Sequence, residues 1–227
     1  MKIGILQTGH APEELLETHG DYAAHFERLL AGNGFSFETY NVVDMAFPQS
    51  PNDCDGWLIT GSKHGAYEDI PFIAPLEDFI RAVDAADVPM VGICFGHQLI
   101  AQALGGKVEK FKGGWAVGHS NYNWGGETVS LNAWHQDQVV ALPDGATVLA
   151  SNDFCKNAAM VYGNRIFTVQ AHPEYGGESI DIIARFRGKG VIPDPQLEAV
   201  SANLDKPLDN ALLGQKIARF FKERSVA

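Results

Sequence analysis

The chain has 227 residues and carries 28 acidic against 17 basic side chains, which gives a net charge of −11 at pH 7. This acidic balance, with no basic run, argues against nucleic acid and anionic membranes as partners. No segment approaches the ~20 apolar residues of a membrane span, and the apolar run at the N-terminus is too short for a signal peptide. The three scattered cysteines do not form a disulfide framework, so we expect a cytoplasmic protein.

The first hundred residues alternate between apolar, strand-like runs and runs with helical periodicity. We expect strands over residues 2–7, 35–43, 53–59 and 88–93, and helices over 21–31, 75–86 and 97–104. Strands that alternate with helices predict an α/β fold with a doubly wound, mostly parallel sheet flanked by helices.

The middle of the chain, from residue 107 to 172, has little helical periodicity and predicts additional antiparallel strands. These short strands are expected at 129–131, 139–142, 147–150, 158–162 and 166–170, with a hairpin signal at Gly163-Asn164 between the last two. Helices are expected again at 179–186 and 209–221, joined by a surface connection over 188–207. With no long linker, we expect a single domain over 1–227, made of a catalytic core (about 2–175) and a helical extension (about 176–227).

Cys94 stands where the strand-like run 88–93 turns into the helical run that follows it. Gly92 and Gly96 lie two residues before and after it, which is the spacing of a nucleophile elbow with sulfur in place of a serine hydroxyl. Side chains at the flanking positions of so sharp a turn would collide, so glycine is needed there. The turn also places the sulfur at a helix N-terminus, which favours the thiolate form. Cys94 is therefore the candidate nucleophile.

A nucleophilic cysteine needs a base, and His172 is the strongest candidate among eight histidines. It follows the apolar run 166–169, at the carboxyl end of a strand, where open α/β sheets bind their ligands. Glu174 is two residues further on and points to the same side in an extended chain, and Pro173 keeps the segment from continuing as a helix. A carboxylate on the far imidazole nitrogen would fix the tautomer of the base.

Two motifs together closely resemble the class I (triad) glutamine amidotransferases, in particular stand-alone proteins similar to the amidotransferase domain of GMP synthase. They are Gly92-Ile93-Cys94-Phe95-Gly96-His97-Gln98 and His172-Pro173-Glu174, with 78 residues from Cys94 to His172. The resemblance implies a flavodoxin-like sheet and a triad of Cys94, His172 and Glu174. It also implies attack on the γ-carboxamide of glutamine, release of ammonia from a γ-glutamyl thioester, and hydrolysis to glutamate.

The resemblance further implies an oxyanion hole made of backbone N–H groups. The residue after the nucleophile, Phe95, should give one donor. The other should come from the loop of Gly61 and Ser62. Family members often have two glycines and a proline in this loop, whereas this chain reads Thr60-Gly61-Ser62-Lys63, so the second donor stays open.

Substrate contacts are also implied by position in the family motifs. Gln98 corresponds to the glutamine after the elbow, whose side chain contacts the bound substrate. His135 and Asp137 belong to a stretch that resembles the family's His-x-Asp segment near the pocket. The glycine-rich loop that ends at Gly118 is expected either to meet the amino-acid end of the substrate or to form a plain surface hairpin.

The chain carries no phosphate-binding loop, no dinucleotide fingerprint and no metal-ligand spacing, so we expect no cofactor and no metal. It also carries no recognisable synthetase, so ammonia would pass to a separate synthetase subunit if it is delivered at all. Three other hypotheses stay open at this point. They are a hydrolase of other γ-glutamyl peptides or amines, a non-catalytic relative that binds a small molecule, and an unrelated α/β cysteine hydrolase.

Overall fold

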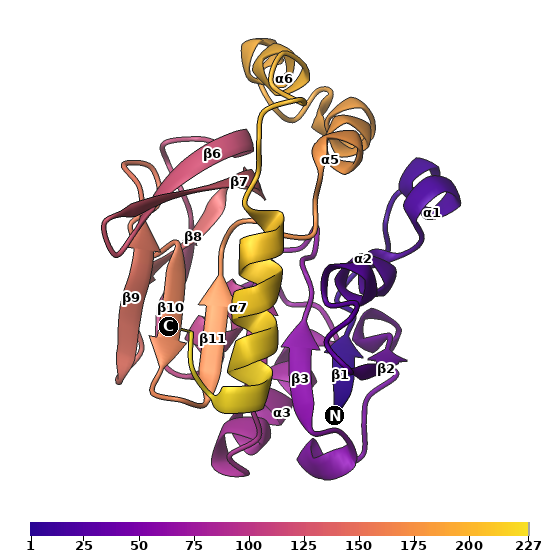
Figure 1. The fold of residues 1–227 in the computed structure, drawn as a ribbon, viewed down its shortest axis with the longest axis vertical. Helices are drawn as coiled ribbons and strands as arrows, with labels where there is room; N and C mark the ends of the chain where they lie inside the picture. The colour runs from indigo at the N-terminus through magenta and orange to yellow at the C-terminus, as the bar shows by residue number, and fades with distance from the viewer. Residues whose placement is uncertain (227) are drawn as a thin grey trace.

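The computed structural model describes residues 1–226 and contains a nine-stranded sheet in the order β2-β1-β3-β4-β11-β10-β9-β6-β7 (Figure 1). The first five of these strands run parallel to one another. With β11 counted as the fifth strand, this is the 2-1-3-4-5 order of flavodoxin-like folds. The predicted doubly wound, mostly parallel sheet is confirmed. The parallel strands are β1 (Lys2–Leu6), β2 (Ser36–Tyr40), β3 (Gly56–Ile59), β4 (Met90–Ile93) and β11 (Ile166–Val169).

The other four strands extend the same sheet in antiparallel fashion beyond β11. A second, two-stranded sheet pairs β5 with β8. The predicted antiparallel strands are therefore present, but β5 and β6 were not predicted, because their alternation of buried and exposed side chains is weak. These strands are β5 (Lys107–Lys110), β6 (Ala116–Trp124), β7 (Glu127–His135), β8 (Asp137–Ala141), β9 (Ala146–Ser151) and β10 (Ala159–Tyr162).

Helices cover both faces of the parallel strands, as the buried side chains of those strands require. Helices α2 (Tyr22–Leu29) and α7 (Asn210–Glu223) pack on one face, and α7 lies across the front of the sheet in Figure 1. Helices α3 (Ile73–Ala85) and α4 (Phe95–Ala103) pack on the other face. Successive strand residues point to opposite faces: Ile5 joins the first core and Leu6 the second.

A third apolar cluster lies beyond the carboxyl ends of the parallel strands, at the top of Figure 1. It joins α1 (Glu13–His19), α5 (Gly177–Ile183), a π-helical turn (Ala184–Gly188) and α6 (Asp194–Ser201). The segment 188–207, expected as a surface connection, contains the helix α6, which was not predicted. Val200 is the one deeply buried side chain of α6, so the helix leaves almost no apolar periodicity in the sequence.

Two single-turn 3-10 helices, Val42–Asp44 and Pro51–Asp53, complete the regular structure. In the described residues, no helix is long and apolar enough to cross a membrane.

The glycine of α4 that packs against β3 is a testable requirement of this fold. A Cβ on Gly96 would lie 2.5 Å from the carbonyl oxygen of Ile59, so Gly96→Ala must displace backbone. We expect it to lower the free energy of unfolding by about 1–3 kcal/mol, measured by urea denaturation. The control is Gly176→Ala, because a Cβ there has no neighbour within 4 Å and the residue has φ −83°. A Gly96→Ala protein as stable as the control would contradict the packing argument.

Candidate active site

Cys94 is held at the end of β4 in a backbone conformation that side-chain-bearing residues rarely adopt, with φ 52° and ψ −102°. A Cβ on Gly92 would lie 2.6 Å from the backbone carbonyl group of Gly96. Glycine is therefore required on both sides of the cysteine, as predicted for a nucleophile elbow. The constraint at Gly96 also comes from β3, which the sequence alone did not show.

Strand pairing brings the histidine segment to the same edge of the sheet. In the parallel pair of β4 and β11, Ile93 is opposite Val169, and the Cys94 N–H donates to the Val169 carbonyl at 2.9 Å. The chain then leaves β11, and the His172 N–H donates to the Asn132 carbonyl of β7 at 2.9 Å. The histidine backbone is thus fixed between the two halves of the sheet, with its ring beside the elbow.

The His172 ring is oriented by two neighbours. Its Nδ1 lies 2.7 Å from a carboxylate oxygen of Glu174, and both side chains are buried, with 4% and 2% exposed. Tyr175 stacks on the imidazole, with 4.4 Å between ring centroids and 12° between planes. Burial by itself lowers the pKa of His172, but the charges on Glu174 and Cys94 outweigh it and raise that pKa to about 10. His172 is therefore an imidazolium at neutral pH, with Nδ1–H donated to Glu174.

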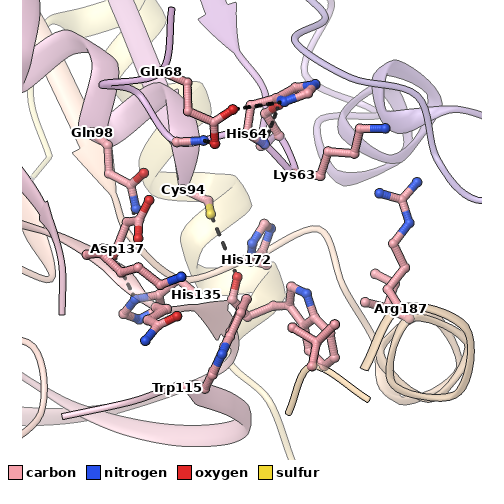
Figure 2. A pocket seen from close by; sticks show the side chains of 18 of the residues that line it. Lys63, His64, Glu68, Cys94, Gln98, Trp115, His135, Asp137, His172 and Arg187 are labelled. Carbon is pink, nitrogen blue, oxygen red and sulfur yellow. Dashed lines mark hydrogen bonds and ion pairs between the residues drawn. The ribbon is translucent and has the colours of Figure 1, made fainter. Parts of the chain in front are cut away.

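The Cys94 sulfur faces the open side of this arrangement. Its Sγ lies 3.9 Å from the Trp134 carbonyl oxygen (dashed line in Figure 2). The Cα of Gly61 faces the dyad, because a Cβ there would lie 3.0 Å from Cε1 of His172 and 3.7 Å from Cβ of Cys94. The loop after β3 therefore lies against the two groups that would react, and a side chain at Gly61 would crowd the His172 ring.

Hydrogen bonds to Thr8 fix this loop. The Thr8 hydroxyl donates to the Gly61 carbonyl at 2.9 Å, and the Ser62 hydroxyl donates to the Thr8 carbonyl at 2.7 Å. In a trans peptide the C=O and N–H point in opposite directions, so the Ser62 N–H points away from Thr8. The Phe95 N–H opens α4, where backbone donors have no acceptor within the helix.

The three predicted polar contacts Gln98, His135 and Asp137 all line the cavity next to Cys94. The Gln98 side-chain amide donates to the Asp137 carbonyl at 2.9 Å, and that same carbonyl lies 3.2 Å from Nδ1 of His135. Burial lowers the pKa of His135 to about 4 and raises the pKa of the Asp137 carboxyl. His135 is therefore neutral.

Gly118 does not line this cavity. It belongs to β6, and a Cβ there would meet Val200 of α6 at 2.9 Å. The geometry therefore gives no support to a substrate contact at Gly118. The residue of this loop that does line the cavity is Trp115, which the glycine pattern of the loop did not single out.

The cavity has a volume of about 360 Å³, within the range of small-molecule sites. Several lining residues were not predicted, because they come from elements far apart in the sequence and carry no local motif. Figure 2 shows Lys63 and Arg187 on one side of Cys94 and Gln98 and Asp137 on the other, while the Glu68 carboxylate points toward His64. The unpredicted lining residues are Tyr22, Lys63, His64, Gly65, Tyr67, Glu68, Lys110, Trp115, Trp134, Gln136, Tyr175, Ile183, Arg187 and Val191.

Across residues 1–226, no group of three or more His, Cys, Asp or Glu side chains is arranged to hold a metal ion. The groups beside Cys94 are instead a base, an orienting carboxylate and backbone donors. This set suits nucleophilic attack on an acyl carbon.

Comparisons with known proteins agree with this chemistry. The family model described as glutamine amidotransferase class-I matches residues 20–186. "Gamma-glutamyl peptidase 4" of Arabidopsis thaliana is 33% identical over 225 residues, which cover 92% of this chain and 90% of the relative. The glutamine-hydrolysing GMP synthase subunit of Halobacterium salinarum is 34% identical over 170 residues, which cover 70% of this chain and 87% of the relative.

The fold has a counterpart among solved structures as well. A crystal structure of a glutamine amido transferase from Methylobacillus flagellatus superposes with a TM-score of 0.76 and 23% sequence identity, and covers 99% of this chain and 92% of that one. At this identity the likeness concerns the fold alone.

The buried pair of His172 and Glu174 predicts a pH-dependent stability. The folded pKa of His172, about 10, exceeds the ordinary value of 6.5, so its proton stabilises the folded state. This stabilisation is complete below pH 6.5 and is lost as the pH rises through about 10. Glu174→Gln should therefore lower the free energy of unfolding by about 3–5 kcal/mol near neutral pH, and by less as the pH approaches 10.

Urea unfolding at several pH values measures this difference, and the exposed carboxylate change Glu198→Gln is the control. Because other titrating groups are common to both proteins, they cancel in the difference. A loss of stability that stayed constant across this pH range would show that the carboxylate does not hold a proton on His172.

Proposed function

The chain belongs to the class-I glutamine amidotransferase family and is an enzyme of that class, and on that premise we propose that it hydrolyses γ-glutamyl amide bonds through a thioester on Cys94. The observation that carries this proposal is the elbow cysteine beside an imidazolium that is itself paired to a buried carboxylate. A cation beside a cysteine favours its thiolate form, which is the form that attacks amides.

The first half of the reaction uses the dyad directly. The Cys94 sulfur attacks the γ-carbonyl carbon and forms a C–S bond, and the negative charge moves to the carbonyl oxygen. His172 then gives a proton to the departing nitrogen as the C–N bond breaks. Glu174 keeps the ring in place and stabilises the imidazolium between the two steps. Ammonia or an amine leaves, and the γ-glutamyl group stays on the sulfur.

We assign the oxyanion to two backbone N–H groups. The Phe95 N–H at the start of α4 is one, with the helix dipole behind it. The Ser62 N–H is the other, and its support is the Thr8 hydroxyl, which holds the Gly61 carbonyl and with it the peptide plane. The sequence left open which N–H of the Gly61-Ser62 loop is the second oxyanion donor. We assign that role to the Ser62 N–H.

The second half reverses the roles. Neutral His172 takes a proton from a water molecule, whose oxygen attacks the thioester carbon. The C–S bond breaks, the thiolate returns, and glutamate is released. In the resting enzyme, His172 is again the imidazolium.

Two leaving groups are supported by different observations. The relative named γ-glutamyl peptidase matches 92% of the chain, and the segment after α5 contributes Arg187 and Val191 to the cavity. We therefore propose a γ-glutamyl peptide as the principal substrate. The GMP synthase relative, which matches 70% of the chain, supports the second candidate, a glutaminase that passes ammonia to a separate synthetase.

The decisive assay measures glutamate release from glutamine and from γ-glutamyl peptides by the purified chain. Cys94→Ala and His172→Ala should each lower kcat/KM by about 10⁴-fold or more, because no activated nucleophile remains. The matched control is Cys54→Ala, since Cys54 is also buried but lies before β3, among apolar side chains.

The outcomes separate the candidates. Fast release from peptides and slow release from glutamine support the peptidase. Slow, Cys94-dependent release from glutamine alone supports the ammonia donor. Activity that survives Cys94→Ala would overturn the assignment of the nucleophile.

A further inference from the structure

We propose that Lys63 and Arg187 form a carboxylate-binding subsite for the leaving group, so that the preferred substrates are γ-glutamyl peptides with a free C-terminal carboxylate. This inference rests on the proposed peptidase function and adds the substrate class. Both side chains line the cavity that contains Cys94. Figure 2 shows them on the same side of the sulfur, opposite Gln98 and Asp137.

The two sides of the cavity differ in charge. On the side of Gln98, burial raises the pKa of the Asp137 carboxyl, and the positive charge of Lys110 opposes that rise. A mixed set of this kind suits the ammonium and carboxylate of a glutamyl group. On the opposite side, Lys63 and Arg187 are cations with no carboxylate in ion-pair distance anywhere in residues 1–226. A substrate whose glutamyl group lies on the side of Gln98 would therefore be favoured if its leaving group carried a negative charge near Lys63 and Arg187.

Arg187 is held in place before any substrate binds. One guanidinium nitrogen donates to the His10 carbonyl at 3.0 Å, and the His10 ring is itself fixed between Asp21 and Asp44 at 2.6 and 2.9 Å. Within residues 1–226, the Arg187 guanidinium makes no other hydrogen bond to the protein. Because the side chain is already ordered, binding a carboxylate costs less conformational entropy.

Lys63 belongs to the loop that follows β3, directly after Ser62. Arg187 lies one residue beyond the end of the family match at residue 186. It is part of the π-helical turn Ala184–Gly188, and such turns are frequent at functional sites. Gly188 of that turn abuts the Trp134 ring, since a Cβ there would meet it at 3.1 Å. The turn is therefore docked against the active site.

Apolar walls next to this subsite leave room for the side chain of the leaving residue. Trp115 and Trp134 lie with 6.2 Å between ring centroids, and Ile183 and Val191 complete the wall. The predicted leaving group is thus an amino acid or short peptide with an apolar side chain and a terminal carboxylate.

The test compares γ-glutamyl-leucine and γ-glutamyl-leucyl-glycine with their C-terminal amides. The four substrates vary the length of the leaving group and the presence of its terminal negative charge. For the wild-type enzyme, kcat/KM should be about 10- to 100-fold higher for the free acid at one or both lengths. Arg187→Met and Lys63→Met should each reduce that ratio, and the double variant should bring it close to one. Arg187→Lys, which keeps the charge, should retain part of it.

The matched controls are Arg185→Met and Lys112→Met. Each removes an exposed cation from the same turn or from a nearby loop, but neither residue lines the cavity. Both should leave the acid-to-amide ratio unchanged. Thermal unfolding of every variant separates a loss of the subsite from a loss of the fold.

Three results would overturn the subsite. A wild-type enzyme that hydrolyses both forms equally would refute it and leave the peptidase function standing. Equal losses on acids, amides and glutamine in the variants would place the cations at the glutamyl carboxylate instead. Glutamine hydrolysis with no peptide hydrolysis would refute the peptidase function, and the leaving-group subsite with it.

Discussion

The site depends on one close approach between backbone segments. Helix α4 begins so near the end of β3 that a single carbon atom added at Gly96 would strike the Ile59 carbonyl. The chain turns sharply between β4 and α4 at the same place, with Cys94 at φ 52°. Such a conformation costs about 1–3 kcal/mol. It persists because Phe95 and Leu99 anchor α4 in the apolar core behind the sheet. Packing of α4 in this core therefore holds the sulfur above the sheet edge.

Electrostatics at this edge work in two layers. In the buried layer, the charges of His172 and Glu174 compensate each other, so that a cation can exist where burial alone would remove it. In the cavity layer, Lys63 and Arg187 remain without a carboxylate partner in the described residues, although the chain as a whole is strongly acidic. Positive charge gathered in a cavity raises the local concentration of anionic ligands there, even when the net charge of the protein is negative. The first layer serves the reaction, and the second serves recognition.

The sequence predicts the features that depend on neighbouring residues better than those that depend on contacts between distant segments. The elbow at Cys94 and the triplet at His172 are local patterns, and the order of strands brings them together, so both were visible in the sequence. The stack of Tyr175 on His172 and the placement of Arg187 depend on where α5 and its π-helical turn settle, which no local pattern encodes. At Gly118 the sequence left two readings open, a substrate contact or a surface hairpin. In the structure its left-handed φ of 72° accompanies a close approach to Val200 of α6, a contact between distant segments that the glycine pattern could not specify.

One set of catalytic residues can serve relatives with two different leaving groups. Attack on a γ-glutamyl carbonyl needs the same acyl pocket whether the leaving group is ammonia or a peptide, so the residues around Cys94 cannot distinguish the substrates. Discrimination must come from contacts that only the larger leaving group can make in the transition state. In this chain those contacts can come from Lys63 and from the turn at Arg187. The Arg187 turn lies outside the elbow and the strand that leads to His172, so it can change without altering the geometry of the triad. Lys63 directly follows Ser62 in the loop that faces Cys94 and His172, so a change there also reaches the backbone beside the reacting groups.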